Sequence, residues 1–249
     1  MNVGEIWTAI RQWTPFAIRT IGYGSVSCFI GPFTKEHSAS LWAMRKWCVS
    51  SLGHLDIRLE LSGVENVPVA GPFVYCSNHQ SLVDILVLGA ALPGDYKWAA
   101  KRSVLNIPFL GWHLRLAGHV PVDRGGGAKA ADDVIERFAE VLRKGKPLLI
   151  FPEGTRSVDG ELKDFKAGAF KAAIRGNAPI VPVALDGTFA MMSKGDFNAG
   201  NQDKVVRVRL GTPISLPAES DDAERVEKLR VQTQAVIGQL FESIRGDVG

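Results

Sequence analysis

A histidine and an aspartate five positions apart are the residues of this chain best suited to acid–base chemistry. His79 and Asp84 lie between two apolar runs, residues 73–76 and 85–88, so their segment is typical of a turn from a strand into a helix. On one regular helix this spacing would separate the two side chains by about 140°. They can meet only if His79 lies in the turn and Asp84 in the first helical turn. A base beside an orienting carboxylate is the arrangement of a catalytic triad without its nucleophile.

The same segment also has a purely structural interpretation. Ser81 and Asp84 have the spacing of a capping box with Ser81 as the N-cap, and a lone histidine can be a satisfied structural residue. No G-x-S-x-G sequence supplies a nucleophilic serine, so a catalytic His79 would have to activate a substrate hydroxyl directly. A metal site is weakly supported, because no cluster of further ligands has a recognisable spacing.

Residues 151–157, Phe-Pro-Glu-Gly-Thr-Arg-Ser, form a second candidate site directly after an apolar run. Gly154 permits close approach of the backbone, Thr155 offers a hydroxyl, and Arg156 offers a two-pronged donor for phosphate. Two lysines that follow add positive charge nearby: Lys163 and Lys166. The pattern favours an anion site, although the segment taken alone could be an ordinary loop.

Residues 120–127 form a third candidate, in which Val-Pro-Val-Asp-Arg is followed by three glycines. Consecutive backbone N–H groups in a glycine loop can form a nest for an anion, here with Arg124 beside it. The loop does not have the spacing of a nucleotide-binding P-loop, and neither does the sequence around Gly145. The alternative is a flexible turn in which Arg124 pairs with an acid.

Short apolar runs alternate with helical patterns from residue 55 onward, and these elements must position the candidate sites. Seven runs have the length and residue types of strands: 55–61, 72–76, 96–100, 119–122, 148–151, 180–185 and 205–210. Apolar residues recur at helical spacing in two further stretches, 134–142 and 226–244. This alternation predicts an α/β fold with a mixed, largely parallel central sheet flanked by helices.

Residues 1–53 differ from the rest of the chain in charge and in tryptophan content. The first 50 residues hold five basic and two acidic side chains, so they carry the whole net charge of +3, and they hold four of the six tryptophans. Helical spacing predicts two amphipathic helices, with a kink at Pro15 and a break between Gly22 and Pro32. Tryptophan beside arginine and lysine is typical of a membrane interface. We expect this segment to contact a membrane; the alternative is that it only closes the core of the main domain.

The bulk properties exclude several classes of protein. The longest uncharged stretch of the N-terminal segment, residues 20–34, is too short and glycine-rich for a spanning helix, which needs about 18 to 20 apolar residues. Glu5 and the lack of a small-residue cleavage pattern argue against a signal peptide. Three scattered cysteines suit a reducing compartment, and the small net charge excludes a basic nucleic-acid footprint. We expect one main domain, residues 54–249, preceded by the two-helix segment 1–53.

Four blocks of the sequence, in order and with fitting spacing, resemble the glycerolipid acyltransferases, and specifically the bacterial 1-acylglycerol-3-phosphate O-acyltransferase family. The blocks are residues 78–84 (His-x4-Asp), Lys101 with Pro108, Gly111 and residues 122–124, residues 151–156 (Phe-Pro-Glu-Gly-Thr-Arg), and residues 180–183 (Ile-Val-Pro-Val). The resemblance covers roughly residues 55–215.

The resemblance implies that His79 is the general base and that Asp84 raises its basicity and fixes its tautomer. The 2-hydroxyl of 1-acylglycerol 3-phosphate would attack the thioester of acyl-CoA or of acyl-acyl carrier protein and give phosphatidic acid. The phosphate end of this acceptor would be bound by residues of the later blocks: Arg124, Glu153, Gly154, Thr155, Arg156 and, as a weaker member, Lys101. Since Glu153 would repel a phosphate, we expect it to position Arg156 or a substrate hydroxyl.

The resemblance implies no metal or redox cofactor, and it implies a phospholipid membrane as partner. The N-terminal segment would hold the enzyme at the cytoplasmic face of the inner (plasma) membrane, as a peripheral or monotopic protein. The same chemistry could act on another acceptor, such as glycerol 3-phosphate, another lysophospholipid or a lyso-aminolipid. A non-catalytic lipid-binding protein is a different class of function. The intact His79 and Asp84 disfavour it, because binding of head groups needs neither.

Overall fold

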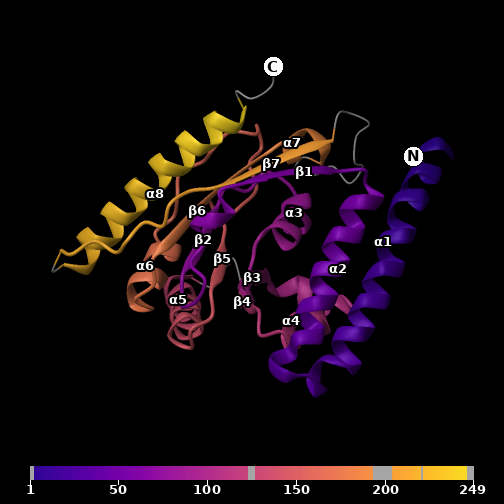
Figure 1. Ribbon diagram of the computed structural model, residues 1–249, viewed down its shortest axis with the longest axis horizontal. Helices are drawn as coiled ribbons and strands as arrows, with labels where there is room; N and C mark the ends of the chain where they lie inside the picture. The colour runs from indigo at the N-terminus through magenta and orange to yellow at the C-terminus, as the bar shows by residue number, and fades with distance from the viewer. Residues whose placement is uncertain (1–2, 123–126, 193–203, 220, 246–249) are drawn as a thin grey trace.

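A mixed sheet of seven strands forms the centre of the structure, a computed structural model that describes residues 3–122, 127–192, 204–219 and 221–245. The strands are β1 (Arg58–Ser62), β2 (Val74–Ser77), β3 (Lys97–Lys101), β4 (Val120–Val122), β5 (Leu148–Ile150), β6 (Ile180–Asp186) and β7 (Val205–Leu210). They lie in the order β1-β7-β6-β2-β5-β3-β4, and every neighbouring pair is parallel except β6 and β7 (Figure 1).

The seven strands are the seven apolar runs of the sequence, with ends shifted by up to three residues. The central strands are buried on both faces, which is why they read as continuous apolar runs rather than as alternating ones. Side chains still alternate between two cores: Tyr75 and Leu149 belong to one, whereas Val74 and Leu148 belong to the other. The predicted α/β fold with a mixed, largely parallel sheet is confirmed.

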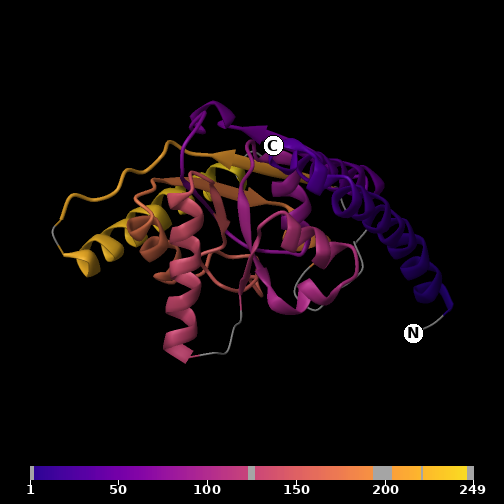
Figure 2. The same cartoon turned by 90° about the horizontal axis from the view of Figure 1, so that it is seen from below.

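Helices cover both faces of the sheet. One face carries α3 (Val83–Ala91) and α4 (Leu110–Leu116) together with the N-terminal helices, and the other carries α5 (Gly127–Arg143), α6 (Gly168–Arg175) and α8 (Asp222–Arg245). The remaining helical pieces are α7 (Thr188–Met191) and the 3-10 turns η1 (Gly31–Phe33), η2 (Lys35–His37), η3 (Val64–Asn66) and η4 (Arg102–Asn106). In Figures 1 and 2, α1 and α8 lie at opposite ends of the molecule.

The N-terminal segment forms a hairpin of two helices, α1 (Val3–Phe29) and α2 (Ser38–His54). Two hydrogen bonds fix their antiparallel register: Trp47 Nε1 donates to Thr20 Oγ1 at 3.1 Å, and Ser40 Oγ donates to the carbonyl of Ser27 at 3.4 Å. The inner face of α2, including Trp47 and Leu52, belongs to the same core as α3. The two predicted helices are therefore present, and they pack on the main domain.

The break predicted between Gly22 and Pro32 is present, but it comes at the end of that stretch and not at Gly22 or Gly24. The helix runs on through Pro15, Gly22 and Gly24, and the chain turns only at Gly31. A side chain at position 24 would place its Cβ 2.7 Å from the Cβ of Phe109, so glycine here allows α1 to approach the start of α4 closely. A Cβ at position 22 would meet no atom within 4 Å.

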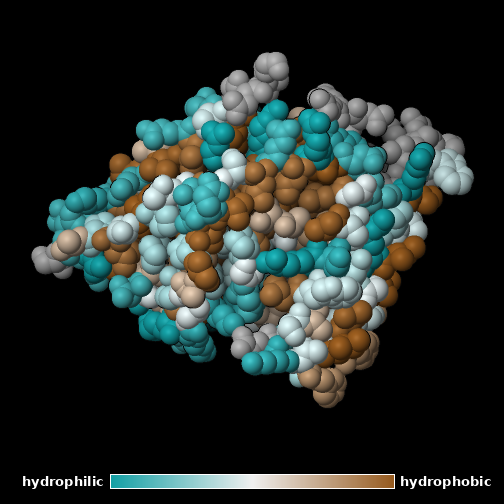
Figure 3. Space-filling model, in the orientation of Figure 1, coloured by the Kyte–Doolittle hydropathy of each residue, from teal (hydrophilic) through white to brown (hydrophobic). Residues whose placement is uncertain are grey.

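The outer surface of the hairpin is apolar and exposed. Trp7 and Trp42 are 67% and 50% exposed, whereas Trp13 is half-buried and Trp47 is buried. Further exposed apolar side chains of the hairpin are Ile10, Ile18, Ile21, Phe29, Ile30, Phe33 and Val49. Figure 3 shows apolar side chains along α1, at the right of the view. In the described part of the chain, no helix combines the length and apolar content that crossing a bilayer requires.

We predict that alanine at the two glycines of α1 has opposite effects on stability. Gly22→Ala should be neutral or stabilise the protein by up to about 1 kcal/mol, because alanine favours a helix and its Cβ meets no neighbour. Gly24→Ala should destabilise it by roughly 1 to 3 kcal/mol, because the added methyl overlaps Phe109. Denaturant titration of the purified protein measures both free energies of unfolding. Equal effects would contradict this packing of α1 on α4.

Candidate active site

The candidate site lies at the carboxyl ends of the central strands. The turn that carries His79 joins β2 to α3, and β2 lies between β5 and β6 in the sheet. The loop after β5 begins at Phe151, and the loop after β6 leads into α7 at Thr188. Because parallel strands present their carboxyl ends at the same edge, these three connections converge.

His79 and Asp84 meet as the sequence predicts. Nδ1 of His79 lies 2.7 Å from Oδ2 of Asp84, with His79 in the turn and Asp84 in the first turn of α3. An ionised carboxylate only accepts hydrogen bonds, so Nδ1 carries the proton and Nε2 keeps its lone pair.

The Asp84 carboxylate is fully buried and accepts hydrogen bonds from four groups. Oδ2 binds His79 and the backbone N–H groups of Gln80 and Ser81, at 2.7 and 2.9 Å, and Oδ1 accepts from Thr188 Oγ1 at 2.5 Å. Asp84 thus holds both the turn and the imidazole, which is more than a helix cap requires.

The expected N-cap is displaced by one residue. Helix α3 has Leu82 as its N-cap, and Leu82 has no capping side-chain bond. Ser81 still contributes to this helix start, because its Oγ accepts from the N–H of Val83 at 3.2 Å and donates to the carbonyl of Met192 at 2.7 Å. The prediction of Ser81 as the N-cap is therefore wrong by one residue. One of the two hydrogen bonds of a capping box is still present, because the N–H of Ser81 donates to the carboxylate of Asp84.

The imidazole ring of His79 is held on its flat face as well. It stacks on Phe151, with ring centroids 4.0 Å apart and an interplanar angle of 17°. The preceding Asn78 is fixed to Leu185 of β6 by two side-chain to backbone hydrogen bonds of 2.8 Å. The carbonyl of His79 accepts from the N–H of Ser157 at 2.7 Å. The ring therefore has little freedom to turn away from Asp84.

The side chain of Glu153 binds the backbone of His79 and does not bind Arg156. Its Oε1 accepts from the N–H of His79 at 2.9 Å, and its buried Oε2 has no hydrogen-bond partner among the described residues. Burial raises the pKa of the Glu153 carboxyl to about 7, against the lowering effect of the bond from His79. Our expectation that Glu153 positions Arg156 is not met in the described ranges, where no ion pair joins the two.

The rest of the loop after β5 presents positive charge. Arg156 is half-buried, and its buried Nη1 has no hydrogen-bond partner in the described part of the chain. Gly154 has a φ of +72°, a conformation that glycine adopts readily. Its N–H donates to the carbonyl of Phe151 at 3.0 Å and closes a tight turn. Thr155 is half-buried between them, and Lys163 Nζ reaches the carbonyl of Arg156 at 3.4 Å.

The remaining two predicted residues lie elsewhere. Lys101 ends β3 and lines the same cavity as His79. Arg124 falls in residues 123–126, outside the described residues, so its role stays a prediction. Over the described ranges, no group of three or more histidine, cysteine, aspartate or glutamate side chains is placed to hold a metal ion.

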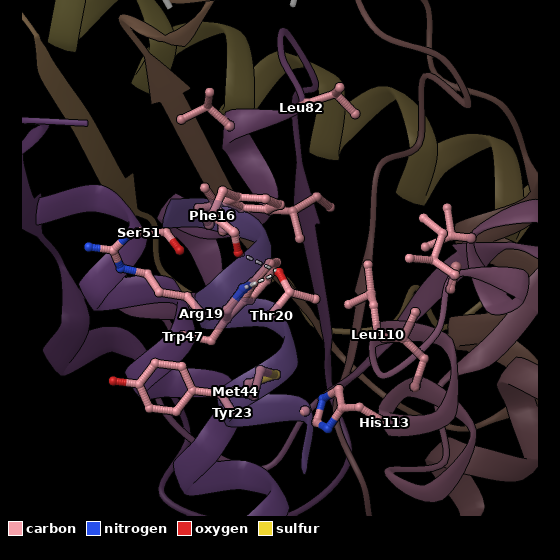
Figure 4. Close-up of a pocket in the computed structure, with 18 of the residues that line it drawn as sticks. Phe16, Arg19, Thr20, Tyr23, Met44, Trp47, Ser51, Leu82, Leu110 and His113 are labelled. Atoms are coloured by element: carbon pink, nitrogen blue, oxygen red, sulfur yellow. Dashed lines mark hydrogen bonds between the residues drawn. The ribbon is translucent and has the colours of Figure 1, made fainter. Parts of the chain in front are cut away.

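A largely apolar cavity of about 370 Å³ reaches His79. It lies between the hairpin on one side and α3, β3 and α4 on the other. Figure 4 shows it extending from Leu82 to a far end formed by Tyr23, Met44 and His113. His113 is buried there against Ser27 Oγ at 2.6 Å, and burial lowers the pKa of its imidazole to about 4, so this histidine is neutral.

Sequence reasoning missed Thr188, the role of Glu153 and the cavity. Thr188 lies 104 positions from Asp84 and belongs to no recognised motif. The cavity is built from α1, α2, α3, β3 and α4, which no local pattern joins. The one available signal was the high apolar content of these elements, which by itself indicates only a core.

We predict that Glu153→Gln changes how stability depends on pH. The folded pKa of about 7 lies above the ordinary value of 4.5, so the wild-type fold loses stability as pH rises from about 4.5 to 7. The glutamine side chain of the variant can still accept from His79 but cannot ionise, so the variant should gain roughly 1 to 3 kcal/mol relative to wild type over that interval. Free energies of unfolding across pH measure this. If the free energies of unfolding of the two proteins changed in parallel with pH, the pKa of Glu153 in the folded protein would be close to its ordinary value.

The sequence of this chain is similar to those of several known proteins. The sequence profile of the family described as Acyltransferase matches residues 58–186, just over half of the chain. The chain is 40% identical over 161 residues to a chloroplastic 1-acyl-sn-glycerol-3-phosphate acyltransferase of Brassica napus, a match that covers 63% of this chain and 45% of that protein. It is 27% identical over 233 residues to the 1-acyl-sn-glycerol-3-phosphate acyltransferase of Salmonella typhimurium, covering 94% and 91% of the two chains. The chain thus spans less than half the length of the plant relative.

The fold has a counterpart among solved structures. The crystal structure of the 1-acyl-sn-glycerophosphate (LPA) acyltransferase PlsC from Thermotoga maritima matches with a TM-score of 0.82 and 24% sequence identity, over 98% of this chain and 97% of that one. The resemblance inferred from the four blocks is confirmed by these relatives. A family profile over half of the chain places the His79–Asp84 turn within the matched region. The chain belongs to the acyltransferase family.

Proposed function

We propose that the protein transfers a fatty acyl group from acyl-CoA or acyl-acyl carrier protein to the 2-hydroxyl of 1-acylglycerol 3-phosphate, giving phosphatidic acid. One observation carries this proposal: Asp84 Oδ2 lies 2.7 Å from Nδ1 of His79, and the imidazole lies beside an apolar cavity. The names of the similar proteins support the choice of acceptor. A base next to a lipid-sized cavity suits an amphiphilic substrate with a hydroxyl.

The mechanism needs no nucleophile from the protein. Nε2 of His79 takes the proton as the acceptor hydroxyl oxygen forms a bond to the thioester carbonyl carbon. Asp84 stabilises the resulting imidazolium, because its buried carboxylate faces Nδ1 at 2.7 Å. When the tetrahedral intermediate collapses, the carbon–sulfur bond breaks, and the imidazolium returns its proton to the departing thiolate. The products are an ester and a free thiol, and the histidine is neutral again.

The cavity is the proposed place for an acyl chain. Its volume of about 370 Å³ lies within the range of small-molecule sites, and most of its lining is apolar. His79 and Phe151 line it near the proposed reacting carbon, whereas Tyr23 and Met44 lie at the far end. Burial of a chain stabilises the complex by about 0.8 kcal/mol per methylene group.

The loop after β5 is the proposed phosphate site. Arg156 carries a buried guanidinium nitrogen without a partner in the described part of the chain, which leaves it ready for an anionic oxygen. Thr155 and Gly154 are adjacent, and Arg124 remains a proposed member from the glycine loop. Glu153 positions the histidine turn, so we do not propose it as a direct ligand. Phosphate contacts would orient the 2-hydroxyl toward Nε2.

Other acceptors keep the same chemistry. Glycerol 3-phosphate, another lysophospholipid or a lyso-aminolipid differ from lysophosphatidate in head group or chain number. A panel of these acceptors, each incubated with the purified protein and labelled acyl-CoA, separates them by the labelled product. Highest turnover with lysophosphatidate supports the proposal. Absence of transfer to every acceptor would favour a lipid-binding protein, although such a protein would have no use for a buried His79–Asp84 pair.

We predict that His79→Ala lowers acyl transfer by about 10² to 10⁴, the usual contribution of a general base. Asp84→Asn should also be severe, because asparagine keeps the turn's acceptor oxygen but removes the charge that favours Nδ1–H and the imidazolium. Turnover with lysophosphatidate is compared at equal protein concentration, and thermal unfolding confirms that each variant is folded. Near-normal turnover in a folded His79→Ala protein would remove the mechanism.

We predict that Arg156→Ala chiefly raises the KM for the acceptor, by about tenfold or more, because a charge-assisted contact to phosphate contributes roughly 1.5 to 3 kcal/mol. The KM for the acyl donor should change little. Lys171→Ala, at an exposed lysine on the adjacent α6, is the control for loss of one positive charge. A rise in the donor KM alone would mean that the phosphate site belongs to the other substrate.

We propose that the hairpin of residues 1–53 attaches the main domain, residues 54–249, to the cytoplasmic face of a phospholipid membrane. Its outer side carries exposed apolar side chains, among them Phe33 at 88% exposure, and the segment carries an excess of basic residues. Helices of this kind bind by burying an apolar face and by attraction to anionic lipid. Both proposed substrates are amphiphiles, which suits an enzyme that works at a membrane surface.

We predict that the full-length protein floats with anionic liposomes and less with neutral ones. Ile18→Gln/Phe29→Gln/Phe33→Gln should reduce flotation about tenfold or more, because three apolar contacts are lost from the hairpin. The matched control, Val69→Gln/Val158→Gln/Val231→Gln, removes three exposed apolar side chains outside the hairpin and should float like wild type. Equal loss in both triple variants, or no flotation of the wild type, would contradict attachment through the hairpin.

A further inference from the structure

The wall of the cavity formed by the hairpin contains two polar groups that the proposed mechanism does not use. Arg19 of α1 lines the cavity and has no hydrogen bond or ion pair to any described residue. Ser51 of α2 also lines it, is 2% exposed, and has a buried Oγ without a hydrogen-bond partner in the described ranges. Buried polar groups are nearly always paired, so an unpaired hydroxyl in a cavity wall indicates a missing partner.

The register of the hairpin brings these two side chains to the same level. In the antiparallel hairpin, Ser40 lies opposite Ser27 and Trp47 lies opposite Thr20. Ser51 is one helical turn after Trp47, so it lies opposite the turn of α1 that precedes Thr20. Long side chains on a helix point toward its N-terminus, so Arg19 reaches back to this same turn. Figure 4 shows Arg19 and Ser51 on the same side of the cavity.

The charge of the cavity favours an anion. Its lining contains two cations, Arg19 and Lys101, and no described aspartate or glutamate. Lys101 is the last residue of β3. A guanidinium beside an apolar surface is stabilised by a phosphate, which can accept two of its hydrogen bonds, while a neighbouring hydroxyl supplies a third.

The position of Arg19 connects the cavity to the apolar outer surface. Its neighbour Ile18 is 64% exposed on the outer side of α1, whereas its other neighbour Thr20 is bonded to Trp47 on the inner side. Arg19 itself is half-buried. The side chain therefore lies at the boundary between the proposed membrane-contacting surface and the cavity. Arg156 does not line this cavity.

We propose that Arg19 and Ser51 form a second anion subsite, which binds the phosphate monoester of the lysophospholipid acceptor as it passes from the membrane into the cavity. This inference rests on the proposed function for the identity of the ligand. The subsite on the hairpin receives the head group first, and the loop with Arg156 holds it during transfer. A phosphate monoester is preferred to the diester of bulk phospholipid, because it carries more negative charge and more unsubstituted oxygens for a fork of donors.

Binding of dodecyl phosphate to the purified full-length protein in dodecyl maltoside micelles tests the subsite. Trp13 and Trp47 line the cavity, so tryptophan fluorescence reports occupancy. Arg19→Gln should weaken binding by about tenfold or more, and Arg19→Lys should retain more affinity because it keeps the charge. Ser51→Ala should weaken binding by about tenfold, as expected for one hydrogen bond from a hydroxyl to a charged acceptor.

Arg11→Gln is the matched control. It removes the same charge from α1 at an exposed position that does not line the cavity, so its affinity should stay within about twofold of wild type. Unchanged binding in Arg19→Gln, or equal loss in Arg11→Gln and Arg19→Gln, would overturn the subsite. A loss of dodecylphosphocholine binding in Arg19→Gln as large as that of dodecyl phosphate would overturn the assignment to a phosphate monoester.

Acyl-transfer kinetics separate this inference from the proposed function. Arg19→Gln should raise the acceptor KM by about tenfold and leave the donor KM within about twofold. If wild type transfers no acyl group while dodecyl phosphate binding still depends on Arg19, the proposed function fails and the anion subsite is supported. If transfer proceeds with an unchanged acceptor KM in Arg19→Gln, the proposed function holds and the subsite is overturned.

Discussion

The buried carboxylate of Asp84 is the interaction on which the site depends. It receives hydrogen bonds from the His79 ring, from two N–H groups of the turn and from Thr188. These donors come from the β2–α3 turn and from the start of α7 after β6, so the order of the central strands is what brings them together. We propose that the carboxylate in turn fixes the tautomer of His79. Glu153, in the loop after β5, accepts a second hydrogen bond from the same turn. Residues that follow β2, β5 and β6 therefore all help to position His79.

Much of this arrangement could be predicted from the sequence, for physical reasons. The central strands β2, β5 and β6 are buried on both faces and β7 alternates, so these strands appear in the sequence as compact apolar or alternating runs between helical patterns. The contact between His79 and Asp84 is local, since a five-residue spacing across a strand-to-helix turn leaves few geometries that use both side chains. Gly154 was expected to permit close approach of the backbone; its φ of +72°, which glycine adopts readily, was not predicted. The fold class and the central pair were therefore accessible without a structure.

The parts that could not be predicted depend on contacts between distant segments. Thr188 is separated from Asp84 by 104 positions, and nothing in its local sequence marks it as a partner. Glu153 was expected to position Arg156 or a substrate hydroxyl, whereas the structure shows it bound to the backbone N–H of His79, 74 positions away. The break predicted between Gly22 and Pro32 comes only at Gly31, because a single glycine lowers helix propensity by about 1 kcal/mol and does not by itself end a helix. The close approach of Gly24 to Phe109 joins the hairpin to the start of α4 and exists only in the folded protein. The cavity, with Arg19 and Ser51 in its wall, is lined by elements that lie far apart in the sequence.

The central claim is that Asp84 holds His79 with its proton on Nδ1 and a free lone pair on Nε2. Nitrogen-15 NMR of histidine side chains, in the full-length protein at a pH where the imidazole is neutral, tests this most directly, and comparison with His79→Ala assigns the signal. We expect a protonated Nδ1 and an unprotonated Nε2 of His79 in the wild type, and a mixture of the two tautomers in Asp84→Asn. A proton on Nε2 in the wild type, or the same tautomer in both proteins, would contradict it.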